Sequence, residues 1–287
     1  MARGGRLNQD VAFIFGAGHS GTTLLGLLLG AHPRVCFAGE AWNSTRLGSR
    51  NTQGRVLGCN LCTADCPVWS DSHADGSPDV YEMLARRTGR RFAVDSTKAV
   101  AWVDQQESAL PSAVRRHLIV LLRDGRAVVN SGLRKYPDAT PEALTTEWVA
   151  HMRRTEDLAT RWPGTVTRLH YEDLAEDTEN TLRSLAAPLG LEFLTTMLDP
   201  WHSEQHPLGG NQGTQFLVAR ARATRAPAGP DLPPPPDTAG LGPSKRGYYR
   251  DHPPAVVLDT RWRDEMSPAA LAVFEAIGGD TNLPYAR

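Results

Sequence analysis

A glycine-rich turn that carries hydroxyl side chains has the residue types needed to bind an anion. Residues 16–23 read GAGHSGTT and directly follow the five apolar residues 11–15. Glycines let several backbone N–H groups point at one place, and a helix starting in the leucine-rich segment 24–29 would add its partial positive charge. The pattern predicts an anion-binding turn between a buried strand and a buried helix. The alternative is a turn that only packs the helix on the strand.

The spacing of this turn is close to that of the nucleotide phosphate loop, G-x-x-x-x-G-K-[ST]. Gly16 and Gly21 match its glycines and Thr23 matches its hydroxyl, but Thr22 stands where that loop has lysine. The nearest cationic candidate is His19, whose imidazole is only partly charged near neutral pH. The turn therefore predicts a phosphate-bearing ligand and argues against ordinary ATP or GTP chemistry.

Three further groups of polar residues follow apolar segments. They are Asp95-Ser96-Thr97-Lys98 after residues 92–94, Arg123-Asp124-Gly125-Arg126 after residues 117–122, and Tyr171 after residues 165–169. Ligands collect at the carboxyl ends of strands in an open parallel sheet, so we expect these groups and the glycine turn to converge. Arg123 is a fork-shaped donor suited to phosphate, and Ser131 follows about two helical turns later. The alternative for Arg123 is a local ion pair with Asp124 that caps a helix.

These segments resemble the sulfotransferases that use 3′-phosphoadenosine 5′-phosphosulfate (PAPS). The family loop [RK]-S-G-T-T reads HSGTT at 19–23, R-D-x-R-x-x-x-x-S reads RDGRAVVNS at 123–131, and Y-E-D-L occurs at 171–174. The resemblance implies that the turn binds the 5′-phosphosulfate, Arg123 and Ser131 hold the 3′-phosphate, and Tyr171 lies near the adenine. The implied donor-binding residues are Gly18, His19, Ser20, Gly21, Thr22, Thr23, Arg123, Ser131 and Tyr171.

A fourth similarity concerns the residues that would carry out the reaction. His32-Pro33 followed by Gly39-Glu40 is similar to the tyrosylprotein branch of the family and to bacterial relatives. It implies that Glu40 is the catalytic base, and that Lys98 and His19 stabilise charge on the transferring group. The expected products are 3′-phosphoadenosine 5′-phosphate (PAP) and a sulfate ester of a phenol, peptide tyrosine, sugar or natural product. Because a sulfuryl group carries less charge than a terminal phosphate, no metal is expected to be required.

Two other functions stay open on the sequence. A P-loop kinase or NTPase with a displaced lysine would need a magnesium-binding acid at a strand end, for which Asp95 and Asp124 are candidates. A nucleotide-binding relative without turnover is the second alternative, since His19 replaces the usual arginine or lysine. Residues 206–211, HPLGGN, could match a glycine loop that closes over the donor.

Three of the four cysteines form a cluster in the sequence. Cys59, Cys62 and Cys66 read C-x-x-C-x-x-x-C, and zinc would need a fourth ligand, for which Cys36 or His73 are candidates. Similar clusters occur in bacterial relatives of the resembled family. The sequence alone favours a compact structural knot over a metal site.

The order of the apolar segments predicts an α/β fold. Strands are expected at 11–15, 92–95, 117–122 and 165–169, a short extended segment before Glu40, and helices between them. A leucine-rich helix ending near Leu189 is expected after Tyr171-Glu172-Asp173-Leu174, and a closing helix from about 267 to 277. This alternation predicts a single three-layer domain, 1–287, with a doubly wound and mainly parallel sheet, similar to P-loop NTPases. Residues 43–78 are expected to be an irregular insertion, and the proline-rich segment 221–242 a loop or flap.

Composition excludes several classes of function. Lys and Arg number 31 and Asp and Glu 32, so the net charge of −1 does not favour nucleic-acid binding. Polar residues interrupt the N-terminal apolar run, which is wrong for a signal sequence or a membrane span. We therefore expect a cytoplasmic enzyme whose partner is a small-molecule or peptide acceptor; its oligomeric state is left open.

Overall fold

The computed structural model describes residues 5–50, 58–62, 66–70, 79–225, 241 and 243–287. A five-stranded sheet has the strand order β2-β3-β1-β4-β5. Its strands are β1 (Asp10–Phe15), β2 (Val35–Gly39), β3 (Phe92–Asp95), β4 (Arg115–Leu122) and β5 (Thr165–His170). Helices flank the sheet, which confirms the predicted α/β class with parallel strands.

Helices alternate with these strands along the chain. The α-helices are α1 (Thr22–Gly30), α2 (Val80–Thr88), α3 (Val100–Ala109), α4 (Gly125–Lys135), α5 (Pro141–Arg161), α6 (Tyr171–Glu176), α7 (Thr178–Ala186), α8 (Gln212–Arg225), α9 (Pro243–Asp251), α10 (Trp262–Glu265) and α11 (Pro268–Asn282). Two short 3₁₀-helices are η1 (Ala41–Arg46) and η2 (Thr195–Leu198).

Backbone contacts divide the chain into two compact units. The first unit comprises Met1–Phe13, Thr23–His117 and Leu194–Ala255, and the second comprises Ile14–Thr22, Leu118–Phe193 and Val256–Arg287. The division falls within β1, α1 and β4, and again after Phe193 and after Ala255. That the whole chain forms one domain stays a prediction.

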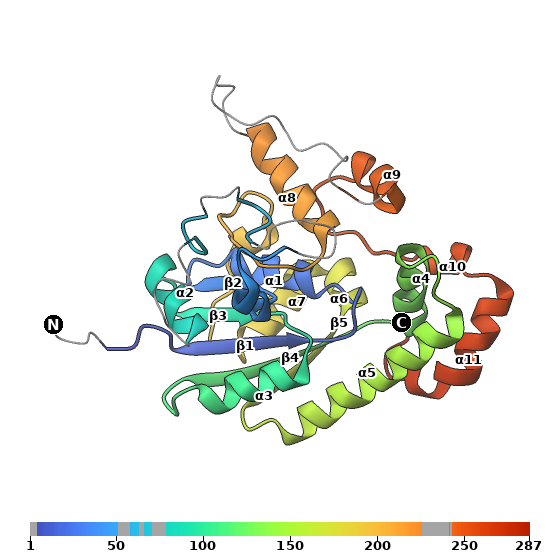
Figure 1. The fold of residues 1–287 in the computed structure, drawn as a ribbon, viewed down its shortest axis with the longest axis horizontal. Helices are drawn as coiled ribbons and strands as arrows, with labels where there is room; N and C mark the ends of the chain where they lie inside the picture. The colour runs from blue at the N-terminus through green and yellow to red at the C-terminus, as the bar shows by residue number, and fades with distance from the viewer. Residues whose placement is uncertain (1–4, 51–57, 63–65, 71–78, 226–240, 242) are drawn as a thin grey trace. The chain divides into compact units, whose positions relative to one another are not determined.

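The first unit contains β2, β3 and the start of β1 in parallel (Figure 1). Residues of β1 pair with β3 from Asp10 opposite Phe92 to Phe13 opposite Asp95. Helix α1 packs closely on β2, because a Cβ atom added to Gly26 would meet the ring of Phe37 at 2.2 Å. This contact explains why α1 is apolar on nearly all sides, as expected for a buried helix.

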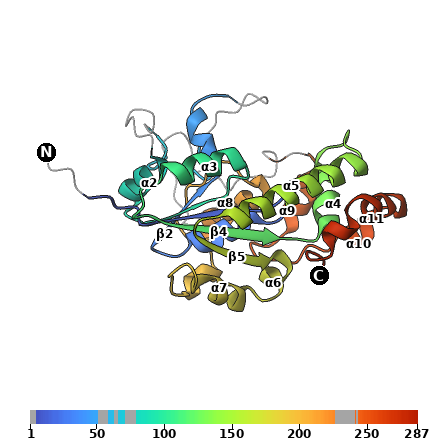
Figure 2. The same cartoon turned by 90° about the horizontal axis from the view of Figure 1, so that it is seen from below.

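The second unit is built around the apolar end of β4 and a long helix. Leu118–Leu122 are buried, whereas β5 is partly exposed along most of its length. Helix α5 begins as its sequence predicts, since Thr140 caps it and Pro141 occupies its first turn. Trp148 of α5 packs against Phe274 of α11, and α4, α5 and α11 contact one another (Figure 2).

The structure adds detail to three predicted segments. Tyr171-Glu172-Asp173-Leu174 itself forms the start of a short helix, α6, and Asp177 then leaves the helical backbone and caps α7 by accepting from the N–H of Asn180. The segment 221–242, expected to be a loop or flap, begins inside α8, which extends to Arg225, while 226–240 and 242 lie outside the described residues. Within the expected insertion 43–78 the structure describes residues 43–50, which include the end of η1, and two short stretches, 58–62 and 66–70.

Candidate active site

The glycine turn between β1 and α1 folds tightly against the end of β4. A Cβ atom on Gly16 would lie 2.5 Å from the carbonyl oxygen of Leu121 and 2.9 Å from Ser20 Oγ. The Ser20 hydroxyl donates to the carbonyl of Ala17 at 2.7 Å and is buried. Gly18, by contrast, is exposed and has open space where a side chain would project. The sequence requires glycine at 16 because the backbone itself approaches a neighbouring strand.

Two residues of this turn have left-handed backbone conformations. His19 has φ of 68° and Gly21 has φ of 95°. A Cβ atom on Gly21 would also lie 2.7 Å from the ring of Tyr171. The His19 ring contacts Tyr136 edge to face, with 6.4 Å between ring centroids. Left-handed residues within a turn are typical of backbone loops whose N–H groups bind anions.

Arg123 links the glycine turn to the start of α6. Its guanidinium donates to the carbonyl of His19 at 2.6 Å and lies over the Tyr171 ring, 4.1 Å from the centroid. The Tyr171 hydroxyl donates to the carbonyl of Val257, and burial raises the pKa of this phenol. The structure thus brings together four predicted donor-binding residues, His19, Gly21, Arg123 and Tyr171, within the second unit.

Asp259 is an unpredicted partner of Arg123. One Asp259 carboxylate oxygen lies 3.4 Å from the Arg123 guanidinium, and its carbonyl accepts from the same group at 3.2 Å. Burial alone would raise the pKa of Asp259, but a hydrogen bond from Arg261 and the charges of Arg123, Arg261 and Arg134 lower it. The predicted alternative, a pair between Arg123 and Asp124, is absent from the described contacts, because Asp124 instead binds Arg126 and caps α4.

The second unit has the chemistry to hold a phosphate-bearing ligand. Arg123 is only 7% exposed, and its Nε is buried without a hydrogen-bond partner among the described residues. A desolvated guanidinium with an unused donor is suited to phosphate oxygens. The open space at Gly18 leaves room in front of the turn. Ser131 lies on α4 with a partly exposed side chain, and its role stays a prediction.

Glu40 and Lys98 form an ion pair in the first unit. Glu40 follows β2 and Lys98 follows β3, so the two residues leave the carboxyl ends of neighbouring parallel strands. Lys98 Nζ lies 2.8 Å from Glu40 Oε1 and donates to the carbonyl of Ser96 at 3.1 Å. Both side chains are 22% exposed, so a reactant can reach them. The sequence predicted both residues, and the structure places them in direct contact.

Asp95 has a structural role that the sequence did not reveal. It is fully buried, and its carboxylate accepts hydrogen bonds from the backbone N–H groups of Ala41 and Thr97. The Tyr81 hydroxyl and Trp102 Nε1 also donate to it, at 2.8 and 2.9 Å. Four donors fill its acceptor positions, which leaves no lone pair well placed for a magnesium ion.

Residues 206–211 hold the backbone around Glu40 in the first unit. The Glu40 N–H donates to the carbonyl of Leu208 at 2.6 Å, and Leu208 N–H donates to the carbonyl of Ala38 at 2.9 Å. Asn211 N–H donates to Thr23 Oγ1 at 2.9 Å. Glycine is required at 209, where φ is 61° and a Cβ atom would lie 2.9 Å from a Glu40 carboxylate oxygen. The segment therefore contacts a predicted catalytic residue and a predicted donor-binding residue.

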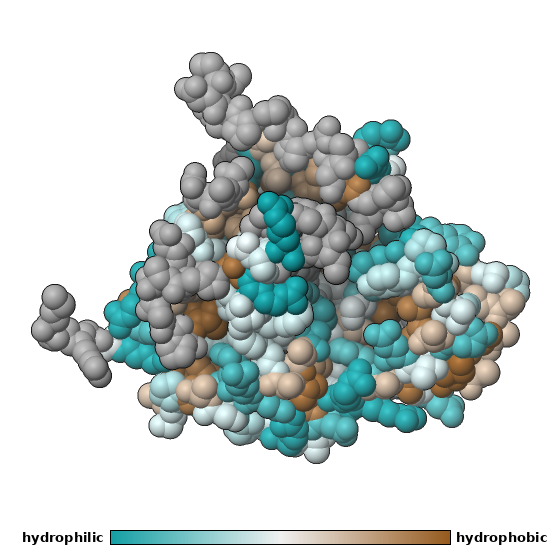
Figure 3. All heavy atoms as spheres, viewed as in Figure 1, coloured by the Kyte–Doolittle hydropathy of each residue, from teal (hydrophilic) through white to brown (hydrophobic). Residues whose placement is uncertain are grey.

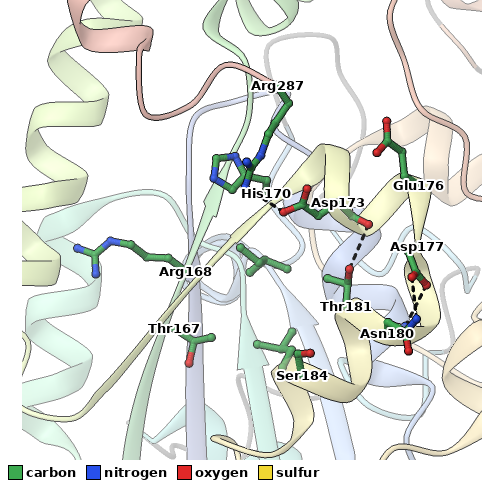
Figure 4. A pocket seen from close by; sticks show the side chains of 12 residues that line it. Thr167, Arg168, His170, Asp173, Glu176, Asp177, Asn180, Thr181, Ser184 and Arg287 are labelled. Atoms are coloured by element: carbon green, nitrogen blue, oxygen red, sulfur yellow. Dashed lines mark hydrogen bonds and ion pairs between the residues drawn. The ribbon is translucent and has the colours of Figure 1, made fainter.

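A surface pocket of about 600 Å³ lies elsewhere in the second unit, along β5, α6 and α7. Figure 4 shows polar side chains from these elements around it, with Asn180 hydrogen-bonded to Asp177 and Thr181 hydrogen-bonded to Asp173. None of the predicted site residues lines this pocket. Its geometry gives no reason to move the candidate site away from the glycine turn.

Among the described helices, none combines the length and the apolar composition that crossing a bilayer requires. The face drawn in Figure 3 mixes hydrophilic and hydrophobic residues.

Comparisons with known proteins agree with the site chemistry. A sequence model described as the sulfotransferase family matches residues 12–195. A Caenorhabditis briggsae protein named for protein-tyrosine sulfotransferase activity is 22% identical over 198 residues, which is 66% of this chain and 69% of that protein.

Two solved structures share the fold. The sulfotransferase domain of the Synechococcus PCC 7002 olefin synthase has a TM-score of 0.57 and 17% identity, covering 96% of this chain and 97% of that one. The sulfotransferase domain from the curacin biosynthetic pathway has a TM-score of 0.50 and 18% identity, covering 70% and 80%. The family match shows that this chain belongs to the sulfotransferase family and is a PAPS-dependent sulfotransferase.

Proposed function

We propose that the enzyme transfers a sulfuryl group to an acceptor hydroxyl with Glu40 as general base and Lys98 as electrostatic stabiliser. The observation that supports this assignment is the 2.8 Å contact between Lys98 Nζ and Glu40 Oε1 at the ends of neighbouring strands. A carboxylate can take the proton of an attacking hydroxyl, and an ammonium group can stabilise the negative charge that develops on sulfuryl oxygens. One contact thus joins the two groups that the chemistry needs.

Donor binding is assigned to the glycine turn, Arg123 and Tyr171. PAPS supplies the sulfuryl group, and PAP is the leaving product. Arg123 would hold the 3′-phosphate through its free Nε–H, and the N–H groups of the turn would bind the 5′-phosphosulfate together with the hydroxyls of Ser20, Thr22 and Thr23. His19 would stabilise charge on the leaving phosphate as imidazolium. Tyr171 would position the adenine end through its contact with Arg123.

We also propose that this reaction proceeds without a catalytic divalent metal. The acid that a kinase-like magnesium site would use, Asp95, already accepts four hydrogen bonds in a fully buried position. Asp124 is likewise engaged, with Arg126 and with the cap of α4. Addition of magnesium should leave turnover unchanged, whereas a magnesium-dependent rate would favour the kinase alternative.

The acceptor is proposed to be a small molecule or peptide with a hydroxyl group. The name of the nematode relative supports a phenolic acceptor such as tyrosine. The site of action is proposed to be the cytoplasm, where the donor is made. We also expect the protein to be related to bacterial sulfotransferases with similar cysteine clusters. A screen of phenols, tyrosine peptides, sugars and alcohols with PAPS, read by PAP release and the mass of the sulfate ester, tests the acceptor class.

Glu40→Gln is the decisive variant for the catalytic assignment. The amide keeps the size of the side chain and an oxygen acceptor but cannot take a proton. We expect kcat to fall by about 10²–10⁴-fold while PAP affinity, measured by calorimetry, stays near wild type. Glu147→Gln, at an exposed position on α5, is the matched control and should turn over normally. Normal kcat in folded Glu40→Gln would refute the assignment.

A further inference from the structure

Four potential metal ligands come together outside the catalytic pair. Cys59, Cys62, Cys66 and His206 each offer one ligand atom, and all four atoms lie within 4.8 Å of one another. The three cysteines are free thiols and belong, with His206, to the first unit. His206 joins the cluster from 140 residues further along the chain, which is why the sequence spacing did not reveal it. Of the fourth ligands considered from sequence, Cys36 is buried in β2 outside this cluster, and His73 lies outside the described residues.

The four ligand atoms lie close enough together for one ion to bind them all. His206 Nδ1 lies 3.1 Å from Cys62 Sγ and 3.5 Å from Cys66 Sγ. With bonds of about 2.3 Å to sulfur and about 2.0 Å to nitrogen, a zinc tetrahedron places its ligand atoms roughly 3.5–3.8 Å apart. Iron–sulfur clusters divide their ligands among several irons and need wider spacing. The C-x-x-C spacing of Cys59 and Cys62 is also typical of structural zinc sites.

Groups around the cluster orient its ligands as the second layer of a zinc site does. His206 Nε2 lies 3.2 Å from the Glu204 carboxylate, so the ring can donate there and turn an unprotonated Nδ1 toward the thiols. Trp69 Nε1 donates to the carbonyl of His206, which fixes its backbone. The guanidinium of Arg222 interacts electrostatically with Cys62 and Cys59. Three thiolates and one divalent ion carry a net charge of −1, which the Arg222 guanidinium offsets.

We propose that Cys59, Cys62, Cys66 and His206 bind a structural zinc ion. Binding would release the thiol protons and form three sulfur–zinc bonds and one nitrogen–zinc bond, with no change of oxidation state. All four positions of the tetrahedron are filled by protein, which makes the site closed to substrate and therefore structural.

The zinc site would also stabilise the backbone at Glu40. Leu208 lies two residues after His206 and forms β-bridges to Cys59 and to Gly39. Its carbonyl accepts the Glu40 N–H. A metal that ties the cysteine segment to His206 therefore restrains the strand that holds the proposed base. Loss of zinc should lower kcat more than PAP affinity, because Arg123 and Tyr171 lie in the second unit.

Metal analysis of the full-length wild-type protein tests the proposal directly. Protein produced in zinc-containing medium and purified without chelators should hold about one equivalent of zinc by mass spectrometry. After exchange, cobalt should give the thiolate charge-transfer and d–d absorption of a tetrahedral site. Absence of zinc after reconstitution, iron in its place, or a disulfide among these cysteines in reduced preparations would each overturn it. These results do not depend on whether Glu40 is the base.

Matched variants assign the ligands. Cys62→Ser and His206→Asn should each reduce zinc content several-fold and lower the melting temperature. Cys36→Ala and His202→Asn change the same residue types outside the cluster and should keep the metal. Equal zinc content in His206→Asn and His202→Asn would remove His206 from the site and overturn the four-ligand assignment.

Discussion

At the scale of single residues, His19 combines backbone strain with chemistry. It is the one non-glycine residue in the described part of the chain with positive φ. Histidine and asparagine tolerate this conformation better than most residues, whereas it raises the free energy of an alanine by about 1 kcal/mol. The strain indicates that the ring itself, and not the backbone conformation alone, is useful at this position.

His19→Asn and His19→Ala should therefore separate folding from catalysis. Asparagine keeps tolerance of the left-handed backbone but lacks the cation, so we expect wild-type thermal stability and turnover lower by about 10²-fold. Alanine should lower both turnover and the free energy of unfolding. Denaturant melts and steady-state kinetics measure the two effects. Wild-type turnover in His19→Asn would show that the ring is only part of the loop.

At the scale of elements, the turn between β1 and α1 contains two glycines whose surroundings differ. Gly21 has φ of 95° and faces the Tyr171 ring at 2.7 Å, whereas Gly18 has open space around it. Gly21→Ala should reduce the free energy of unfolding by about 1–3 kcal/mol and weaken PAP binding, because the turn must shift away from Tyr171. Gly18→Ala should change stability by less than about 0.5 kcal/mol. Equal melting temperatures for the two variants would contradict the described turn.

Strands and their carboxyl ends could be predicted because their signals are local. The apolar runs that became β1, β3 and β4 are bounded by polar residues, and Glu40 and Lys98 lie within three residues after the ends of β2 and β3. The helical state of residues 171–176 and the cap at Asp177 were not predicted, because no apolar periodicity marks them. Contacts between distant segments, beyond the shared edge at the strand ends, could not be predicted.

Leu208, Asp259 and His206 illustrate that limit. Each acts through a partner more than a hundred residues away in sequence: Glu40, Arg123 and the cysteines respectively. An aspartate or leucine in a loop is common, and HPLGGN at 206–211, although it suggested a loop over the donor, did not indicate contacts with Glu40 or the cysteines. Helix α8 was also missed, because its alanines and arginines do not form a clear apolar stripe.

At the scale of the whole molecule, buried aspartates should make stability depend on acid. The pKa of Asp259 is lowered in the fold despite burial, through Arg261, Arg123 and Arg134. Unfolded aspartate titrates near about 3.9, so the stabilising contribution is complete above that pH and is lost as pH falls toward the lowered folded value. We expect the free energy of unfolding to fall steeply below about pH 4.

Asp259→Asn tests this expectation by urea denaturation across pH. The variant should be less stable than wild type at pH 7 by about 1–3 kcal/mol, and should lose less stability on acidification. Asp251→Asn, at an exposed position of α9, should follow the wild-type curve. Parallel acid curves for Asp259→Asn and wild type would rule out this source of the pH dependence.

The pairing of Arg123 with Asp259 bears on the rates of donor binding and product release. The carboxylate is attached to the same chain as the arginine that is proposed to hold the 3′-phosphate, so it acts as a tethered competitor at high effective concentration. If Arg123 holds the 3′-phosphate as proposed, the entering donor competes with the Asp259 carboxylate, and this carboxylate pairs with Arg123 again when the product leaves. On that proposal Asp259 lowers the affinity for the nucleotide and speeds the release of PAP, which favours turnover over tight binding.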